Sequence, residues 1–403
     1  MTILAARFFT VIALVAGSAT IVAAQQPEPG TREASITQEQ AQKVPTLRPY
    51  VASRGELFAD RAERILAGAG HGWHPFFQNA YSGGGFTLGA GYLQYLSPYN
   101  SVDVRGSYTI SGYKRLEAGF NMRQLFHRRG SLSGLVGWRE ATEVKFYGLG
   151  PDTPLEAATN YSFRQPYGSA LLEFWPTRRF LVMTGGLELS KWSQQEGNGR
   201  DPSVETVYTP ETLPGLGANA TYLHGQGSVG LDWRTSPGYS RRGGVYTITF
   251  HDYVDQDDAF GFRQIDYEAI QHFPVLREAW VISLRGRVQT ALDKDDQQIP
   301  FFMMPAVGGG SSLRGYSSWR FRDLNSLLLQ AEWRIMVNRF FDTAVFYDTG
   351  KVTSSRSDID FDGLKHDYGF GVRFHSPIAT PLRVDVAKSP EGLHFVFSST
   401  AVF

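Results

Sequence analysis

The sequence has 403 residues with 39 Lys and Arg against 39 Asp and Glu, and this neutral balance argues against a nucleic-acid partner, which would require a basic excess. The absence of cysteine excludes disulfide scaffolds and thiolate metal sites. A mean hydropathy of −0.25 is too polar for a helical membrane protein, whereas 19% charged residues, 43 glycines and 14% aromatic residues suggest exposed β-structure.

The N-terminal residues predict export. Arg7 precedes a short, mostly apolar stretch from Phe8 to Val22, and Val22-Ala23-Ala24 matches a small-residue cleavage site. A signal peptide is therefore predicted over residues 1–24. A membrane anchor is the alternative, but the apolar stretch is short and interrupted by Gly and Ser. No later window approaches the ~18 consecutive apolar residues of a transmembrane helix.

Residues 25–74 are predicted to be a periplasmic lead-in segment. Its first half is polar and rich in Pro, Gln and Glu, which is typical of a flexible chain. Ser53-Arg54-Gly55-Glu56 then matches a capping box, and apolar residues follow at helical spacing. One short helix is expected near 54–67.

From residue 75 to residue 403 the apolar pattern changes to a period of two. Leu329, Ala331 and Trp333, for example, alternate with Gln330 and Glu332. Strict alternation gives each strand one apolar and one polar face. We predict sixteen antiparallel strands, at 75–81, 84–96, 100–111, 113–126, 130–146, 160–175, 180–193, 221–235, 244–255, 260–273, 279–292, 325–337, 342–352, 366–375, 381–388 and 392–403.

The connections between these strands differ systematically in length. Short, turn-rich connections alternate with long ones, and the long ones cover about 147–159, 194–220, 293–324 and 353–365. Short turns at one end and long loops at the other are typical of an outer-membrane β-barrel, whose even strand number leaves both termini periplasmic. The fold class is therefore predicted as all-β, a sixteen-stranded transmembrane barrel over 75–403.

Two segments differ from the repetitive strand pattern. The first is Gly308-Gly309-Gly310-Ser311-Ser312-Leu313-Arg314-Gly315-Tyr316, inside the longest loop. The second is Phe346-Tyr347-Asp348-Thr349-Gly350, in the second strand after that loop. By alternation Phe346, Asp348 and Gly350 share the inward face, where Gly350 leaves room for another backbone to approach.

Together these segments resemble the bacterial surface-antigen domain of the BamA/TamA-like superfamily of outer-membrane assembly and secretion barrels. The resemblance implies that the long loop folds into the lumen, where the tip Arg314-Gly315-Tyr316 contacts an inner wall carrying Phe346, Asp348 and Gly350. Five predicted strands follow the loop, as in a sixteen-stranded member. The resemblance is strong over about 300–403 and weak over 75–299.

The same resemblance assigns roles to the last strand and to the barrel seam. Phe395, Phe397 and the terminal Phe403 look like a terminal assembly signal. The first and last strands are expected to pair, because an open edge would leave unpaired backbone groups in hydrocarbon. In the superfamily this seam is implied to be a lateral gate. About 50 residues separate Ala24 from the first strand, too few for a complete periplasmic (POTRA) domain of the family's kind.

Arg314 is predicted to form a luminal ion pair with Asp348, with Glu332 as the alternative acceptor. A planar guanidinium can bind a carboxylate through two hydrogen bonds. A solvated Asp348 is the simpler interpretation in the absence of the loop motif. The outward aromatic residues are expected to contact lipid; they are Trp333, Tyr347, Tyr368, Phe370, Phe395 and Phe397.

Two weaker signals do not indicate a site. Gly225-Gln226-Gly227-Ser228-Val229-Gly230 matches a dinucleotide fingerprint but lies within a predicted strand rather than before a helix. His71 and His74 have no further ligand at metal-binding spacing. We expect no metal, no cofactor and no catalytic residues.

The function predicted from the sequence is non-enzymatic assistance of protein or lipid insertion or translocation at the outer membrane. The expected partners are outer-membrane lipid and client outer-membrane proteins or secreted chains, and a monomeric barrel is favoured. A passive, porin-like diffusion channel is the alternative, followed by an outer-membrane hydrolase.

Overall fold

The computed structural model describes residues 71–177, 180–276, 278–338, 340–376, 380 and 382–398, together with Arg32, Ile36 and Glu39. The chain divides into two compact units, Met1–Ala59 and Asp60–Phe403, and the second contains the strands described below. The predicted signal peptide and the predicted helix near 54–67 lie outside the described residues.

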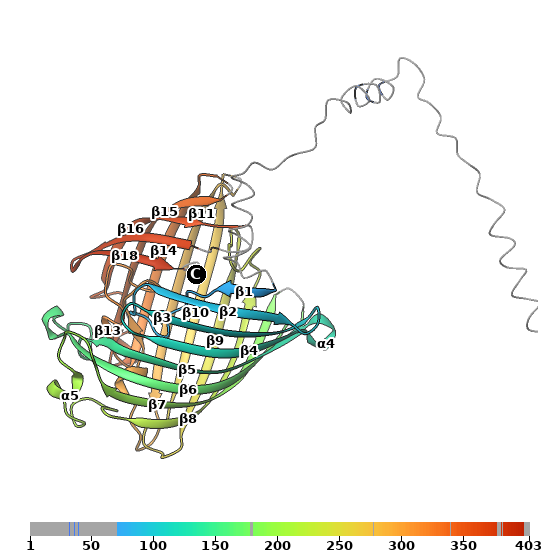
Figure 1. Ribbon diagram of the computed structural model, residues 1–403. Helices are drawn as coiled ribbons and strands as arrows, with labels where there is room; N and C mark the ends of the chain where they lie inside the picture. The colour runs from blue at the N-terminus through green and yellow to red at the C-terminus, as the bar shows by residue number, and fades with distance from the viewer. Residues whose placement is uncertain are drawn as a thin grey trace, which may run out of the picture. The chain divides into compact units, whose positions relative to one another are not determined.

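Sixteen strands form one antiparallel sheet in which each strand pairs with its neighbours in the chain (Figure 1). A separate two-stranded sheet lies inside the longest loop and consists of β12 (Ala306–Val307) and β13 (Phe321–Arg322). The sixteen strands are β1 (Gly72–Pro75), β2 (Thr87–Tyr95), β3 (Asn100–Thr109), β4 (Lys114–Gln124), β5 (Gly130–Phe146), β6 (Thr159–Phe174), β7 (Leu181–Glu196), β8 (Asn219–Asp232), β9 (Gly243–Asp255), β10 (Phe262–Val275), β11 (Trp280–Asp293), β14 (Asn325–Met336), β15 (Phe341–Thr353), β16 (Lys365–Phe374), β17 (Leu382–Ser389) and β18 (Gly392–Ser398).

Short helical segments lie in the connections between the strands, and Arg32, Ile36 and Glu39 before the first strand are also helical. The segments in the connections are α4 (Leu125–Arg128), η2 (Leu155–Ala157), α5 (Val204–Val207), η3 (Phe301–Met303) and η4 (Arg356–Asp358). No described helix is long and apolar enough to cross a lipid bilayer.

The sheet is apolar on its outer face and polar on its inner face, as the alternating pattern predicts. On β15 the outward Val345 and Tyr347 are 48% and 47% exposed, whereas Phe346 and Asp348 between them are buried. This inside-out arrangement would be costly in water but is the arrangement that a lipid environment favours. The six outward aromatic residues predicted to contact lipid are all exposed.

The first strand differs from the prediction. β1 covers Gly72–Pro75 rather than 75–81, and the following residues leave the sheet toward the barrel interior. Inward side chains hold this segment: Ser107 donates to the carbonyl of Gln78 at 2.8 Å, and Arg115 donates to that of Asn79 at 2.9 Å. The strand prediction was wrong here because, beyond Phe76, whose amide still bonds the carbonyl of Gly89 on β2, side chains of β3 and β4 bond the backbone of residues 78 and 79.

The hydrophobic core lies at the long-loop end of the barrel. Phe146 of β5, Tyr161 of β6 and Trp192 of β7 pack against Phe301 and Phe302 of the longest loop. A sixteen-stranded barrel is too wide for its own wall side chains to fill. The loop residues therefore supply the packing that the wall cannot.

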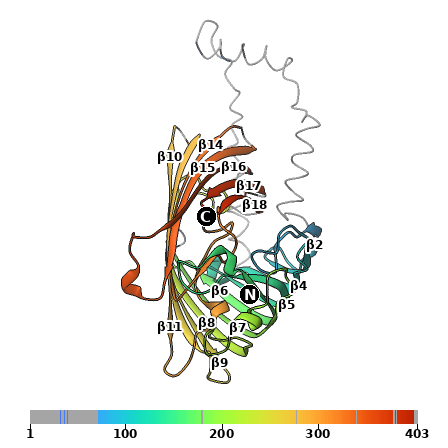
Figure 2. The same cartoon turned by 90° about the vertical axis from the view of Figure 1, so that its left-hand side faces the viewer.

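The two edge strands face each other as the sheet curls round (Figures 1 and 2). The described residues of β1 and β18 form no ladder with one another, so the predicted pairing of the first and last strands is not found in this part of the chain. Residues 399–403, which include Phe403, lie outside the described residues.

Candidate functional site

The longest loop, residues 294–324, folds back into the lumen. Its stem is the β12–β13 pair, in which Ala306 is opposite Arg322 and Val307 is opposite Phe321. The tip is a compact turn in which the amide of Gly309 donates to the carbonyls of Leu313 and Tyr316 at 3.0 and 3.1 Å. Gly309 adopts a φ of 97°, a left-handed conformation that glycine accepts without steric cost.

Arg314, at the tip of this loop, is completely buried in a carboxylate cluster. Its Nε donates to Asp348 Oδ2 at 2.6 Å and its Nη2 to Asp348 Oδ1 at 2.8 Å. Its Nη1 donates to Glu332 at 2.9 Å and to Asp385 at 3.4 Å. The side chain therefore binds both acceptors that the sequence offered as alternatives, and a third carboxylate besides.

The inner-wall residue Phe346 completes the binding site for the guanidinium. Arg314 Cζ lies 3.4 Å from the centroid of the Phe346 ring, so the planar cation stacks on an aromatic face. Burial by itself lowers the pKa of Arg314, but the hydrogen bond and charge of Asp348, with the charges of Glu332 and Asp385, raise it overall above its usual value. The loop tip therefore carries a permanent positive charge.

The two residues after Arg314 are tightly packed. A Cβ atom on Gly315 would lie 2.5 Å from Cβ of Asp367, so no larger residue fits without movement of the wall. Tyr316 packs against Phe321 and donates to the carbonyl of His366 at 3.3 Å. Burial raises the pKa of Tyr316 to about 12, so its hydroxyl stays a donor even in mildly alkaline solution.

Gly350 lies on the inner wall, but it serves a different contact from the one expected. A Cβ atom there would lie 2.5 Å from the carbonyl oxygen of Leu327, on the paired strand β14. The backbone that approaches Gly350 therefore belongs to the wall itself and not to the inserted loop.

A network of further charged residues extends the cluster across β14, β16 and β17. Arg373 donates to Glu332 at 2.7 Å and also bonds Asp385. Arg383 reaches the carbonyl of Gly310 at 2.6 Å, which ties β17 to the loop. Sequence reasoning assigned these three residues no role, although Arg373, Arg383 and Asp385 have inward parity on neighbouring strands.

Gln330 also belongs to this network. Its amide donates to the carbonyl of Ser312 at 2.7 Å and to Asp348 at 3.1 Å, and the residue is 3% exposed. Alternation alone predicts a solvated lumen side chain that tolerates change. The folded loop instead buries Gln330, so we expect substitutions there to be costly.

The segment Ser318–Arg320, termed here the bridging segment, contacts both edges of the sheet. Trp319 Nε1 donates to the carbonyl of Ser82 at 3.0 Å, and its ring stacks on Tyr81 at 4.7 Å in the β1–β2 connection. Arg320 binds both carboxylate oxygens of Glu391, in the β17–β18 turn, at 2.8 and 3.0 Å. The loop thus joins the two sheet edges, whose described residues do not pair with one another.

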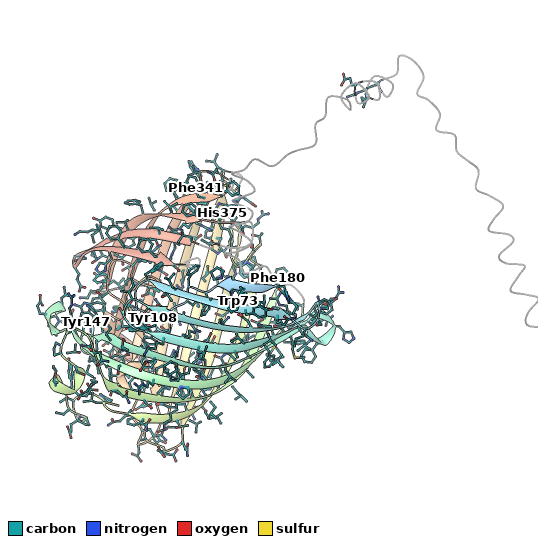
Figure 3. The ribbon with its side chains drawn as sticks, in the orientation of Figure 1. Trp73, Tyr108, Tyr147, Phe180, Phe341 and His375 are labelled. Atoms are coloured by element: carbon teal, nitrogen blue, oxygen red, sulfur yellow. The ribbon has the colours of Figure 1, made fainter. Side chains whose placement is uncertain are left out.

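The short-turn end of the barrel is occupied by the β8–β9 connection. Tyr239, 4% exposed, donates to Asp342 of β15 and stacks on His375 with 4.0 Å between ring centroids. Arg334 donates to the carbonyl of Ser240. This connection reaches past β10, β11 and β14 to β15 and therefore lies across the short-turn mouth of the barrel. Figure 3 labels His375 at the short-turn end and Tyr147 at the long-loop end.

The signals set aside from the sequence form no cofactor site in the described structure. No group of three His, Asp or Glu side chains among the described residues is arranged to hold a metal. His74 bonds Asp103 at 2.9 Å, and His71 lies against Tyr92 and Tyr95. Residues 225–230 lie within β8, away from any helix N-terminus.

The last strand exposes its aromatic side chains on the outer face. Phe395 and Phe397 of β18 are 63% and 68% exposed. Both point away from the lumen, in the same direction as Tyr368 and Phe370 of β16, so the edge of the sheet continues the outer apolar band.

Comparison with known proteins finds one family model that matches part of the chain. Residues 216–398 match the model of the Omp85 superfamily domain. The structure is similar to that of BamA from Haemophilus ducreyi lacking POTRA domains 1–3, with a TM-score of 0.59 and 16% identity, over 81% of this chain and 69% of that one.

A second solved structure shares the fold. CdiB from Escherichia coli matches with a TM-score of 0.55 and 13% identity, over 81% of this chain and 61% of that chain. The search of curated proteins gives no significant match. The Omp85 superfamily domain matches residues 216–398, and the two solved structures share the barrel fold; both findings agree with the resemblance predicted from the sequence.

Proposed function

We propose that this chain is a non-catalytic outer-membrane barrel that assists insertion or translocation of protein chains, with its termini on the periplasmic side. The family match supports a general role of this kind. The parts proposed to act are the buried ion-pair cluster of Arg314, Asp348, Glu332 and Asp385, the bridging segment Ser318–Arg320 and the two sheet edges. The expected partners are lipid and client outer-membrane or secreted proteins.

The observation that carries the proposal is the bridge between the sheet edges. The described parts of β1 and β18 share no ladder, while Trp319 contacts the connection after β1 and Arg320 contacts the turn before β18. Two side-chain contacts are weaker than a continuous backbone ladder, because each hydrogen bond contributes only about 0.5–1.5 kcal/mol net. A client strand can therefore compete for these edges at low cost.

The loop inside the lumen and the β8–β9 connection at the short-turn end argue against the diffusion-channel alternative. Arg314 and its loop lie in the lumen against β14–β17, and Tyr239 lies at the opposite mouth, bonded to Asp342 of β15. In an open porin, water would fill the lumen from one end of the barrel to the other. In planar bilayers we therefore expect small, flickering currents rather than large, steady ones.

A reversible disulfide tests whether loop movement is needed. The Cβ position of Gly83, in the β1–β2 connection, lies 3.5 Å from Cβ of Ser318, within the range that disulfides span. The chain has no cysteine, so in the pair Gly83→Cys with Ser318→Cys the intended bond is the only disulfide that can form within one molecule. The reduced form of the same variant is the matched control, since it carries the same backbone strain at Gly83.

The cellular readout is the outer-membrane proteome after depletion of the protein. We expect the oxidised variant to leave client proteins depleted and the reduced variant to restore them. If the oxidised variant restores the proteome as well as the reduced one, the bridging segment does not need to move. If depletion changes no outer-membrane or secreted protein, the proposed function itself is wrong.

A further inference from the structure

We propose that the outer surface at the short-turn end carries a binding site for an anionic glycerophospholipid. The site is a groove of about 830 Å³ formed by the turn after β4 and the outer faces of β6 and β7. This volume lies within the range of about 300–1,000 Å³ that is usual for small-ligand sites. The proposal does not depend on the proposed function.

The walls of the groove are apolar and fit an acyl chain. Leu172 and Phe174 of β6 and Met183 of β7 line it, and Phe126 closes one side, with its ring 5.8 Å from that of Phe174. A Cβ atom on Gly185 of β7 would meet no atom within 4 Å. The missing side chain at Gly185 therefore creates the floor of the groove.

The rim of the groove is basic and suits a phosphate-containing headgroup. His127 and Arg129 line the groove, and Arg128 lies between them on the same turn. These three side chains are exposed and make no ion pair with another described residue. No acidic residue lines the groove in the described structure. Basic pockets at membrane depth are sites for anionic lipid headgroups.

The backbone of the turn is held in an unusual conformation that places these groups together. Gln124, Phe126, His127 and Arg128 have φ values of 65°, 50°, 59° and 69°. Such left-handed conformations disfavour non-glycine residues, and a cluster of them is a reason to look for function. Here the turn directs Phe126 onto the outer wall of the barrel and keeps the cationic residues at the rim.

The position of the groove selects a membrane lipid over a soluble ligand. It opens on the outer, apolar face of the barrel, next to the aromatic rings Phe126 and Phe174. Aromatic belts mark the level of the headgroups. A lipid bound here places one acyl chain against Gly185 and its phosphate beside His127 and Arg129.

Native mass spectrometry of the barrel released from phosphatidylethanolamine nanodiscs doped with phosphatidylglycerol tests the site. We expect the wild type to retain phosphatidylglycerol in preference. The double variant His127→Gln with Arg129→Gln should retain about tenfold less phosphatidylglycerol, with phosphatidylethanolamine unchanged. Gly185→Leu should displace both lipids, because its side chain fills the floor.

Gly168→Leu is the matched control, because Gly168 also faces outward on β6 and does not line the groove. A Cβ atom there would make only ordinary van der Waals contacts, at 3.9 Å to Val136 and 4.0 Å to the carbonyl of Leu135. An unheated gel, on which a folded barrel migrates differently from an unfolded one, checks each variant. Equal retention of the two lipids by the wild type overturns the headgroup assignment. Retention by folded Gly185→Leu at the wild-type level overturns the groove itself.

Discussion

Replacement of Arg314 by Ala should destabilise the barrel more than replacement of any one of its acidic partners. Arg314 makes ion pairs with Asp348, Glu332 and Asp385, and it is fully buried. Its removal leaves these three carboxylates facing two remaining guanidinium groups, those of Arg373 and Arg383. An uncompensated buried charge costs about 3–5 kcal/mol.

Asp348→Asn provides the opposite test. This change removes one negative charge but leaves Arg314 bound to Glu332 at 2.9 Å and stacked on Phe346. We therefore expect a smaller loss, about 1.5–3 kcal/mol, which is typical of a hydrogen bond to a charged group. Arg314→Lys should be intermediate, because an ammonium keeps the charge but cannot reproduce the two-pronged bond to Asp348 or the ring stacking.

Urea titration in lipid vesicles, followed by tryptophan fluorescence, measures the free energy of unfolding of each variant. Arg356→Ala is the control, because Arg356 is an exposed arginine on η4 at the same end of the barrel. We expect this control to lie within about 0.5 kcal/mol of the wild type. A loss below about 1 kcal/mol for Arg314→Ala is what a solvent-exposed ion pair would give. It would refute the inference that the buried ion pairs of Arg314 stabilise the barrel.

Three further changes probe other parts of the molecule. Gly315→Ala places a Cβ atom 2.5 Å from that of Asp367, so we expect a stability loss of about 1–3 kcal/mol from overpacking, and a result near zero in the same titration would show that the wall yields. Ala331→Arg, on the outer face of β14, should lower the free energy of unfolding in vesicles by about 2–4 kcal/mol. Asn121→Arg, which lines a luminal cavity, should cause only a small loss of stability, and equal losses would contradict a lipid-facing outer surface. Tyr239→Ala removes the stack on His375 and the bond to Asp342, so its single-channel currents should be larger than those of Tyr239→Phe, which keeps the ring. Identical currents would show that Tyr239 does not restrict the channel.

The sequence by itself determined the class of fold and the centre of the site. The period of two requires that each strand have one apolar and one polar face, and alternating loop lengths require a barrel with distinct ends. Parity alone placed Phe346 and Asp348 on the inner wall, and the structure buries both. The loop motif then identified Arg314 as the cation that reaches them.

Tertiary structure decided how many partners that cation has. Glu332, Asp348 and Asp385 come from three strands that lie close together only because β14, β15, β16 and β17 are consecutive in the curled sheet. The two sequence segments predict one ion pair, between Arg314 and a single carboxylate. The convergence of three carboxylates on Arg314 depends on sheet curvature and on the depth to which the loop inserts, and neither leaves a signal in local sequence.

The remaining features depend on contacts between residues far apart in the chain. Tyr239 bonds Asp342, Trp319 reaches Ser82, and Arg320 reaches Glu391. Each lies in a connection, where no repeating pattern reports which side the backbone will turn toward. The sequence therefore specified the wall of the barrel through periodic burial, whereas the folded structure alone placed its loops, because loop positions depend on shape and charge complementarity across the lumen.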